Sequence, residues 1–231
     1  MSLERAAAAF LIFLPLAFNL FFLLLARGFD YPDILRGQTE DILSRVQAGG
    51  VRLKLLWYGF MLTAVLLAPL AVLLGQVLAR DQLAIVPTAT VIGVLAAIVQ
   101  FVGLARWPFL VPALARTYHD PAASDARRDA TVVVFEAFHR YLGVAIGECL
   151  GYLLTGAWTV LVGVAMLQSS AFDPWLAWPG ITIGIFLAAG SVEFVGRFEE
   201  KGWKLAGAIV PIAYTAWSLW LVTAGIVLLV A

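Results

Sequence analysis

The sequence predicts an all-α integral membrane protein, built as a bundle of six transmembrane helices. Apolar residues make up 62% and charged residues 13% of the 231-residue chain, and its mean hydropathy is +0.94. Soluble domains carry about 25% charged residues. The chain also contains six apolar segments, each long enough to cross a hydrocarbon core about 30 Å thick as a helix. No segment alternates polar and apolar residues over the ~10 positions of a membrane β-strand, so helices remain as the way to bond every backbone amide in lipid.

The six apolar segments give the predicted spans in chain order. They cover residues 6–26, 55–78, 84–105, 142–167, 175–195 and 205–230. Because these spans leave little sequence for an independent soluble domain, we expect residues 1–231 to form a single transmembrane helical domain.

The first connection, FDYPDILRGQTEDILSRVQAGG, is expected to form an amphipathic helix at the membrane interface. Pro32 and Asp33 suit a first helical turn, and Gly49 with Gly50 is typical of a helix end. Between these limits, apolar side chains share one helical face at about 100° per residue: Leu35, Ile42 and Val46. Such a helix serves as a connector that covers the end of the bundle, or as a lid or partner-binding element.

The third connection leads into a long fourth helix. Pro108 and Pro112 interrupt regular helix bonding, whereas Asp120 followed by Pro121 favours a new helix start. No proline interrupts the next segment, so one helix, or two abutting helices, is predicted over residues 121–168. At 1.5 Å per residue this segment would be about 70 Å long, more than twice the hydrocarbon thickness. We therefore expect its first half to project on the cytoplasmic side.

Lysine and arginine residues are distributed unevenly between the two sides of this bundle. If the connections alternate sides, one side carries only Arg5 and Arg80. The other side carries Arg27, Arg36, Arg45, Arg52, Lys54, Arg106, Arg116, Arg127, Arg128, Arg140, Arg197, Lys201 and Lys204. Because positively charged connections stay in the cytoplasm, the first, third and fifth connections are predicted to be cytoplasmic and both termini to lie outside.

Three glycines spaced by four, Gly143, Gly147 and Gly151, occur where the fourth helix enters the membrane. At 100° per residue they form one stripe, and small residues at this spacing let a second helix approach closely. We expect the stripe to be a helix-packing surface. Glu136 and Arg140 extend it toward the cytoplasm with the i, i+4 spacing of a surface ion pair.

Glu148 lies about 100° round the helix from Gly147, in a sector shared with Tyr141 and Tyr152 and off the glycine stripe. A charged side chain in hydrocarbon costs about 2.5–3.5 kcal/mol, and normally faces the interior with a partner. Further polar side chains are predicted at a similar depth, in the cytoplasmic half of the bundle: Asn19, Gln100, Glu193 and, as the expected counter-ion, Arg106.

Two hypotheses fit this polar cluster. In the structural one, Arg106, Arg197 or a proton neutralises the carboxylates, and the amides join helices. In the functional one, the cluster lines a pocket open to the cytoplasm, which holds a small polar or amphiphilic ligand, a lipid headgroup or a transported proton. The candidate ligand-binding or proton-coupling residues are Asn19, Gln100, Arg106, Glu148, Tyr152, Glu193 and Arg197.

The sequence lacks the motifs of common catalytic and cofactor sites. The single Cys149 excludes an internal disulfide and a cysteine-cluster metal site. Glu136 and His139 have the spacing of a helical metal-binding pair, but no second pair accompanies them. No phosphate-binding loop or serine nucleophile motif occurs, and a formal net charge of zero gives no reason to expect nucleic acid. We assign no catalytic residue and no metal ligand, and expect no cofactor.

Four phrases spread over most of the chain are characteristic: FDYPDILRGQ, GGVRLKLLWYGFML, RWPFLVPALARTY and EAFHRYLGVAIGECLGYLLTGAW. In these phrases the sequence resembles the bacterial multi-pass membrane proteins grouped as domain-of-unknown-function family 4386. The resemblance implies a small helical bundle in a bacterial cytoplasmic membrane. It implies no activity, cofactor or catalytic residue, so no role transfers to individual positions.

The function expected from these observations is that of a binding, sensory or structural subunit in the membrane rather than of an enzyme. The alternative is a small proton-coupled transporter that uses Glu148 and Glu193, although the internal repeats common in transporters are not evident. An enzyme acting on a lipid ranks third. The expected partners are the lipid bilayer, a lipid or small amphiphilic ligand, and a second copy of the chain or another membrane subunit.

Overall fold

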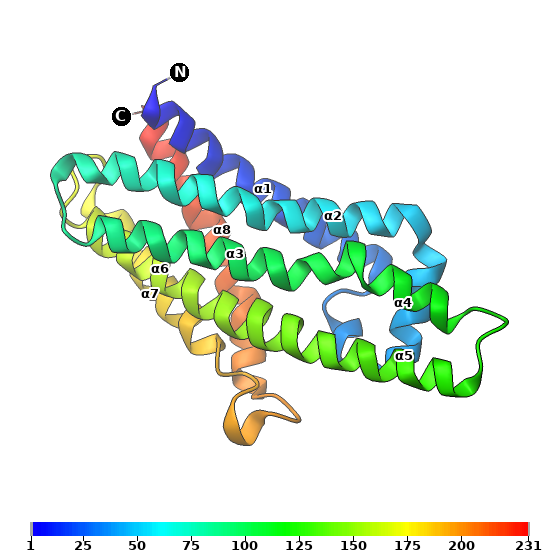
Figure 1. Cartoon of the computed structure of the whole chain (residues 1–231). Helices are drawn as coiled ribbons and strands as arrows, with labels where there is room; N and C mark the ends of the chain where they lie inside the picture. The colour runs from blue at the N-terminus through cyan, green and yellow to red at the C-terminus, as the bar shows by residue number, and fades with distance from the viewer. Residues whose placement is uncertain (1, 231) are drawn as a thin grey trace.

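The computed structural model describes residues 2–230, which form helices joined by turns, with no β-strand in this range (Figure 1). The predicted all-α class is therefore confirmed. Five helical runs are long and apolar enough to cross a membrane: Leu3–Phe29, Thr39–Asp81, Val86–Tyr118, Asp125–Met166 and Lys204–Val230. A further apolar helix, Pro174–Gly190, has 17 residues, which corresponds to a length of ~26 Å.

The first connection differs from the single amphipathic helix predicted to start at Pro32. After α1 (Leu3–Phe29), a short 3-10 turn called η1 (Asp33–Arg36) forms, and α2 (Thr39–Leu78) begins only at Thr39. Gly37 and Gln38 between them have extended backbones, which redirects the chain. We refer to residues 30–38 as the linker.

Gly50 bends α2 at the place where the sequence predicted a helix end. Its φ of 53° and ψ of −139° are non-helical, and such a positive φ favours glycine because it has no Cβ. The expected helix end is therefore a bend inside a longer helix. The predicted apolar stripe is buried in the protein: Leu35, Ile42 and Val46 all belong to one core cluster.

A break at Leu110 separates α3 (Val86–Phe109) from α4 (Val111–Tyr118), between the two prolines that predicted an interruption. The long fourth helix begins at Asp125, where the Ser124 hydroxyl caps it by accepting from the Arg127 backbone N–H. From there α5 (Asp125–Phe138), η3 (His139–Leu150) and α6 (Gly151–Met166) follow one another as a single 42-residue run. The middle part, η3, is a π-helix, in which backbone hydrogen bonds join residues five apart.

The last two helices form a hairpin. α7 (Pro174–Gly190) ends before the limit predicted at residue 195, and a turn containing η4 (Gly196–Phe198) leads to α8 (Lys204–Val230). The Trp203 backbone N–H donates to the Glu193 carbonyl oxygen at 2.7 Å, which closes this turn. Glu193 therefore lies beyond the end of α7.

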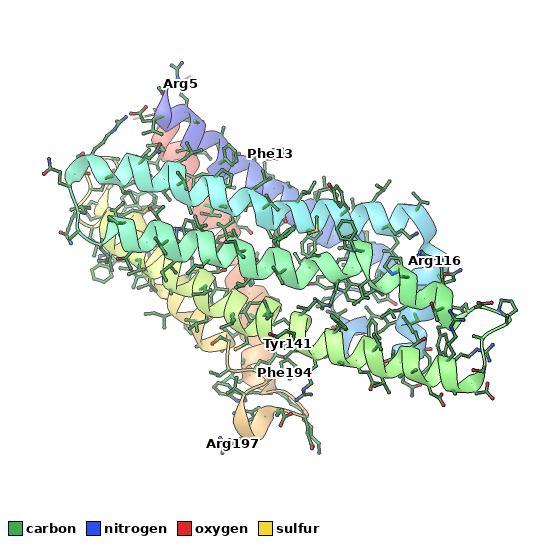
Figure 2. All side chains as sticks on the ribbon, in the orientation of Figure 1. Arg5, Phe13, Arg116, Tyr141, Phe194 and Arg197 are labelled. Atoms are coloured by element: carbon green, nitrogen blue, oxygen red, sulfur yellow. The ribbon has the colours of Figure 1, made fainter. Side chains whose placement is uncertain are left out.

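Two buried clusters form the core. The first, which includes Ala8, Leu74, Trp158 and Leu221, lies toward the end of the bundle where both termini lie side by side (Figure 1). The second lies toward the other end and includes Phe29, Leu43, Trp57, Trp107 and Phe135. Figure 2 shows these two ends, with Arg5 at the first and Arg116 at the second. A cavity lies where residues of the two clusters meet.

Candidate functional site

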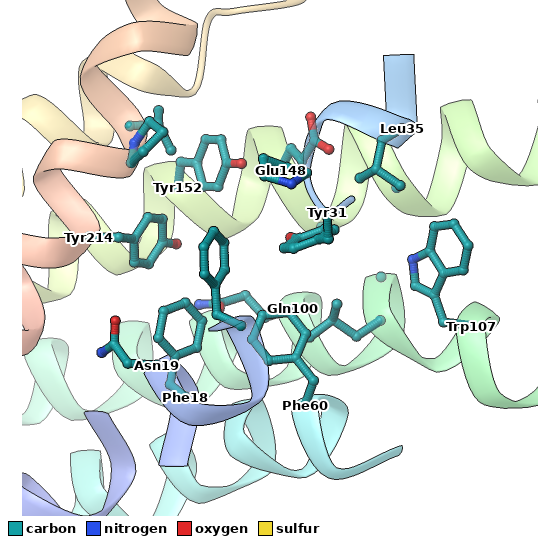
Figure 3. A pocket seen from close by; sticks show the side chains of 18 of the residues that line it. Phe18, Asn19, Tyr31, Leu35, Phe60, Gln100, Trp107, Glu148, Tyr152 and Tyr214 are labelled. Carbon is teal, nitrogen blue, oxygen red and sulfur yellow. The ribbon is translucent and has the colours of Figure 1, made fainter. Parts of the chain in front are cut away.

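A cavity of about 390 Å³ is enclosed by α1, the linker, α2, α3, η3, α6 and α8. A third of the residues in its wall are aromatic: Phe18, Phe22, Tyr31, Phe60, Trp107, Tyr152 and Tyr214. Figure 3 shows several of these rings arranged around the space, with Glu148 and Gln100 among them. The Tyr152 and Tyr214 rings meet edge to face, with 5.6 Å between their centroids. The linker contributes Tyr31, whose ring packs edge to face against the ring of Phe22 at 5.3 Å.

The structure places five of the seven predicted site residues in the wall of this cavity: Asn19, Gln100, Arg106, Glu148 and Tyr152. Two others are not part of the wall. Glu193 lies in the turn after α7, and Arg197 lies in η4, with its guanidinium 4.8 Å from the centre of the Phe198 ring. The cavity therefore joins polar residues from four separate helical segments.

Arg36 in η1 joins the two glutamates, although it was not among the predicted site residues. Its Nη2 lies 3.3 Å from Oε2 of Glu148 and 3.4 Å from Oε1 of Glu193. The expected counter-ions were Arg106 and Arg197, but within residues 2–230 neither forms an ion pair with these carboxylates. Burial lowers the pKa of Arg36, but the two carboxylates outweigh it and raise that pKa above its ordinary value.

Arg106 lies in the wall of the cavity, with only 6% of its surface exposed. Its Nη1 donates to the Gly103 carbonyl oxygen within the same helix, and its Nε is buried without a hydrogen-bond partner among the described residues. The guanidinium lies against Gly143, where a Cβ would come within 2.5 Å of Nη2. Gly143 therefore provides the space that this side chain occupies.

The π-helical form of η3 changes the face to which Glu148 belongs. The calculation at 100° per residue placed Glu148 away from the glycine stripe and beside Tyr141. In the structure Glu148, Gly143 and Gly147 all line the same cavity, whereas Tyr141 is 64% exposed. Bonds between residues five apart bring Glu148 above Gly143, and this explains the difference.

The glycines also bring η3 and α6 close to α3. A Cβ on Gly103 would lie 2.6 Å from the Cα of Gly147, and a Cβ on Gly151 would lie 3.1 Å from the Gln100 side chain. The helices thus approach each other backbone to backbone at Gly103 and Gly147, which favours glycine at both positions.

The two amide side chains in the cavity wall, Gln100 and Asn19, donate hydrogen bonds to other groups of the protein. Gln100 donates from Nε2 to the Thr155 hydroxyl at 2.7 Å. Asn19 donates from Nδ2 to the Pro15 carbonyl oxygen at 2.7 Å and to the Ser218 hydroxyl at 2.9 Å, which joins α1 to α8. The amide nitrogens therefore hold helices together, as the structural hypothesis expected of them.

Glu136 and Arg140 do not pair with each other as the i, i+4 spacing suggested. Glu136 accepts a hydrogen bond from the Thr39 hydroxyl at 3.2 Å, and Arg140 pairs with Glu199 at 2.5 Å. Both residues thus contact other elements, namely the start of α2 and the turn between α7 and α8.

Besides Arg36, two titratable groups outside the long apolar helices have displaced pKa values. Burial raises the pKa of Glu193 above its ordinary value, with the charge of Glu148 adding to this effect and Arg36 opposing it. Burial likewise raises the pKa of Tyr31, with the charge of Glu148 adding to the shift, so its hydroxyl stays protonated and able to donate.

The exposed residues of the cavity wall lie on α1, on α8 and in the linker. Among the residues that line it, Asn19 of α1 and Pro211 and Thr215 of α8 are exposed rather than covered by other parts of the protein. Pro32 and Asp33 of the linker are exposed at the same cavity. The opening is thus bounded by two long apolar helices and by the linker.

Comparison with known proteins gives one match. The sequence model of a family described as "Domain of unknown function (DUF4386)" matches residues 6–225, which is nearly the whole chain. No curated protein and no solved structure matches the chain. Within residues 2–230, no group of three or more histidine, cysteine, aspartate or glutamate side chains is placed to hold a metal ion.

Proposed function

Since the chain belongs to the DUF4386 family, whose description names no activity, we propose a role from its own cavity: the protein binds a small amphiphilic ligand taken up from the lipid bilayer. The observation that carries this proposal is the cavity of about 390 Å³, whose wall combines aromatic side chains with charged and amide groups. Pockets for small molecules typically measure about 300–1,000 Å³ and combine apolar walls with a few polar groups that orient the ligand.

The opening between α1 and α8 supports entry from the bilayer. Both helices are apolar and long enough to span the bilayer. In a spanning arrangement, an opening beside them at Asn19 and Thr215 faces the lipid tails. From Asn19 to the end of α1 at Phe29 the helix rises ~15 Å, about half of the hydrocarbon thickness. The cavity would then reach from the middle of the bilayer toward its surface, which suits a molecule with a tail and a polar head.

The topology that fits this role has six spans, with α7 as the fifth and both termini outside the cytoplasm of a bacterial cell. The termini lie side by side in Figure 1, as an even number of spans requires. The uneven distribution of lysine and arginine supports this orientation. A reporter of membrane side fused to the N-terminus should report the outer side, and a cytoplasmic signal would contradict this topology.

Blocking the opening tests the binding role. Thr215→Trp places a large ring at an exposed residue of the cavity wall, whereas Leu219→Trp places the same ring one turn further along α8, at a residue that is 65% exposed and outside the wall. Native mass spectrometry of the purified proteins should show a bound amphiphile on the wild type and on Leu219→Trp. Thr215→Trp should lose most of it while unfolding at about the temperature of the delipidated wild type.

Two results would contradict the binding role. One is an equal amount of bound amphiphile on Thr215→Trp, which would place the molecule elsewhere on the surface. The other is the absence of any bound molecule on the wild type, together with no saturable uptake of a labelled twelve-carbon amphiphile.

A second candidate function, proton-coupled transport, is favoured by the sharing of one guanidinium between two carboxylates. Arg36 balances one of the two charges of Glu148 and Glu193, so a proton on either glutamate would neutralise the group of three. In sealed vesicles, Glu148→Gln and Glu193→Gln should then abolish movement of protons that accompanies the ligand. If ligand binding is retained and the wild type moves no protons, the binding role alone applies.

A further inference from the structure

Arg106 is the charged group in the cavity wall that has no carboxylate partner. Its side chain is almost fully buried, its Nε has no acceptor among residues 2–230, and the acceptor that the structure gives for its Nη1 is a carbonyl oxygen of its own helix. A guanidinium has five N–H donors and remains ionised in proteins, so it cannot escape burial by losing a proton. A buried charge normally has a partner of opposite sign.

The acidic residues nearest to the site do not supply that partner. Glu148 lines the same cavity, but its carboxylate is held by Arg36 at 3.3 Å, and Arg36 also holds Glu193. Asp33 lines the cavity from the exposed linker and forms no ion pair among residues 2–230. The donors of Arg106 are therefore available to a molecule in the cavity.

We propose that the amphiphile carries an oxyanion head, a carboxylate or a phosphate, which binds to the guanidinium of Arg106. This inference rests on the binding role proposed above. The planar fork of an arginine matches two oxygens of either group and gives charge-assisted hydrogen bonds. A cationic head would instead be repelled by the charge of Arg106. It would also find Glu148 already paired with Arg36.

The apolar part of such a ligand has aromatic side chains to pack against. The rings of Phe18 and Phe60 lie in the wall, and a separate, smaller space of about 20 Å³ shares Phe18 and Gln100 with it and is lined by Leu67 of the first core cluster. A single chain bound at Arg106 would therefore extend along the aromatic wall toward the middle of the bundle.

The test uses the full chain in nanodiscs of zwitterionic lipid, with radiolabelled dodecanoate as the probe in a scintillation proximity assay. Four unlabelled competitors of equal chain length differ only in their heads: dodecanoate, dodecyl phosphate, dodecanol and dodecyltrimethylammonium. One of the two anions should compete at least tenfold better than the alcohol, since a hydrogen bond to a charged group provides about that factor. Whichever anion competes better identifies the head.

Arg106→Gln should reduce this preference to about threefold or less, because a neutral amide cannot supply the charge. Arg197→Gln is the matched control, since its guanidinium lies outside the cavity, and should leave the preference unchanged. Comparison between variants also cancels the different partitioning of the four molecules into lipid. If Arg106→Gln does not fold, Arg106→Lys keeps the charge without the planar fork and should weaken anion binding while leaving the alcohol unaffected.

The outcomes separate the two proposals. Saturable binding that Thr215→Trp abolishes, but with equal competition by alcohol and anion, would overturn the oxyanion head and leave the binding role intact. Stronger competition by the ammonium compound would overturn it as well. Absence of saturable binding by any of the four molecules would contradict the binding role itself.

Discussion

Arg36 connects three parts of the chain through one side chain. It lies in η1, and its two carboxylate partners are 112 and 157 positions away, in η3 and in the turn after α7. The guanidinium also lies 4.4 Å from the centre of the Phe194 ring in the same turn. The linker is thereby held against the cavity by a residue that is itself 45% exposed.

Arg36→Gln should destabilise the protein because it leaves Glu148 and Glu193, both mostly buried, without a cation. We expect the free energy of unfolding to fall by about 1–2 kcal/mol. This value is at the low end of the range for hydrogen bonds to charged groups, because Arg36 is partly exposed to solvent. The control is Arg45→Gln, whose pair with Asp30 is exposed on both sides and should contribute about 0–1 kcal/mol. Thermal unfolding in one detergent compares the two, and equal effects would contradict the role of Arg36.

Glu193 should make stability depend on pH. Its pKa is raised above the ordinary 4.5 in the native protein, so the native state binds this proton more tightly than the unfolded state does. The resulting stability is present in full below about pH 4.5 and is lost as the pH rises through the raised pKa. The unfolding temperature of Glu193→Gln should therefore fall less over this window than that of the wild type. Glu200→Gln, at an exposed position in the same turn, should keep the wild-type slope.

At the scale of elements, the apolar runs predicted where helices occur, but not their local geometry. Each run predicted a helix because backbone groups in lipid must bond internally. The face of Glu148 could not be obtained in this way, because a calculation at 100° per residue assumes an α-helix and η3 is a π-helix. Arg36 was placed on the same side as the glutamates by the charge distribution, yet its contact with them depends on the turn at Gly37 and on packing between distant segments.

The close approach of α3 to η3 predicts which glycine substitutions lower the free energy of unfolding most. Gly103→Ala places a Cβ 2.6 Å from the Cα of Gly147 and 2.9 Å from the carbonyl oxygen of Leu142, so backbone must move. We expect it to lower the free energy of unfolding by about 1–3 kcal/mol. Gly147→Ala, whose nearest contacts would be 3.2 and 3.3 Å, should lower it less.

Gly28→Ala is the matched control on α1, because within residues 2–230 no atom beyond its own stretch of helix lies within 4 Å of the added Cβ. It should be neutral or should raise the free energy of unfolding by about 0.4–1 kcal/mol, since alanine restricts the unfolded chain. Thermal unfolding of the three variants checks the order, and a Gly103→Ala protein as stable as Gly28→Ala would contradict the close helix contact.

At the scale of the whole molecule, the cavity lies between the two core clusters, where space is left between their side chains. Its wall includes Leu35, Phe60 and Trp107 of the second cluster and Tyr214, which packs against the first. A ligand in this space would contact both clusters at once. It would also contact Tyr31 of the linker, which is otherwise held by aromatic packing.

Removal of the ligand should therefore destabilise the protein and loosen one region in particular. A ligand at 100 times its dissociation constant stabilises a protein by about 2.7 kcal/mol, which for a chain of this size is a shift of about 5–10 °C in unfolding temperature. Delipidated wild type should lose this increment, and Thr215→Trp should show no such loss. Backbone amide hydrogen exchange should become faster in residues 30–38 and near Trp107. The amides around Gly225 and Leu11, which are in contact at the other end of the bundle, should stay protected. Uniform acceleration along the chain would mean that the amphiphile acts as general solvent, and not as a ligand of the cavity.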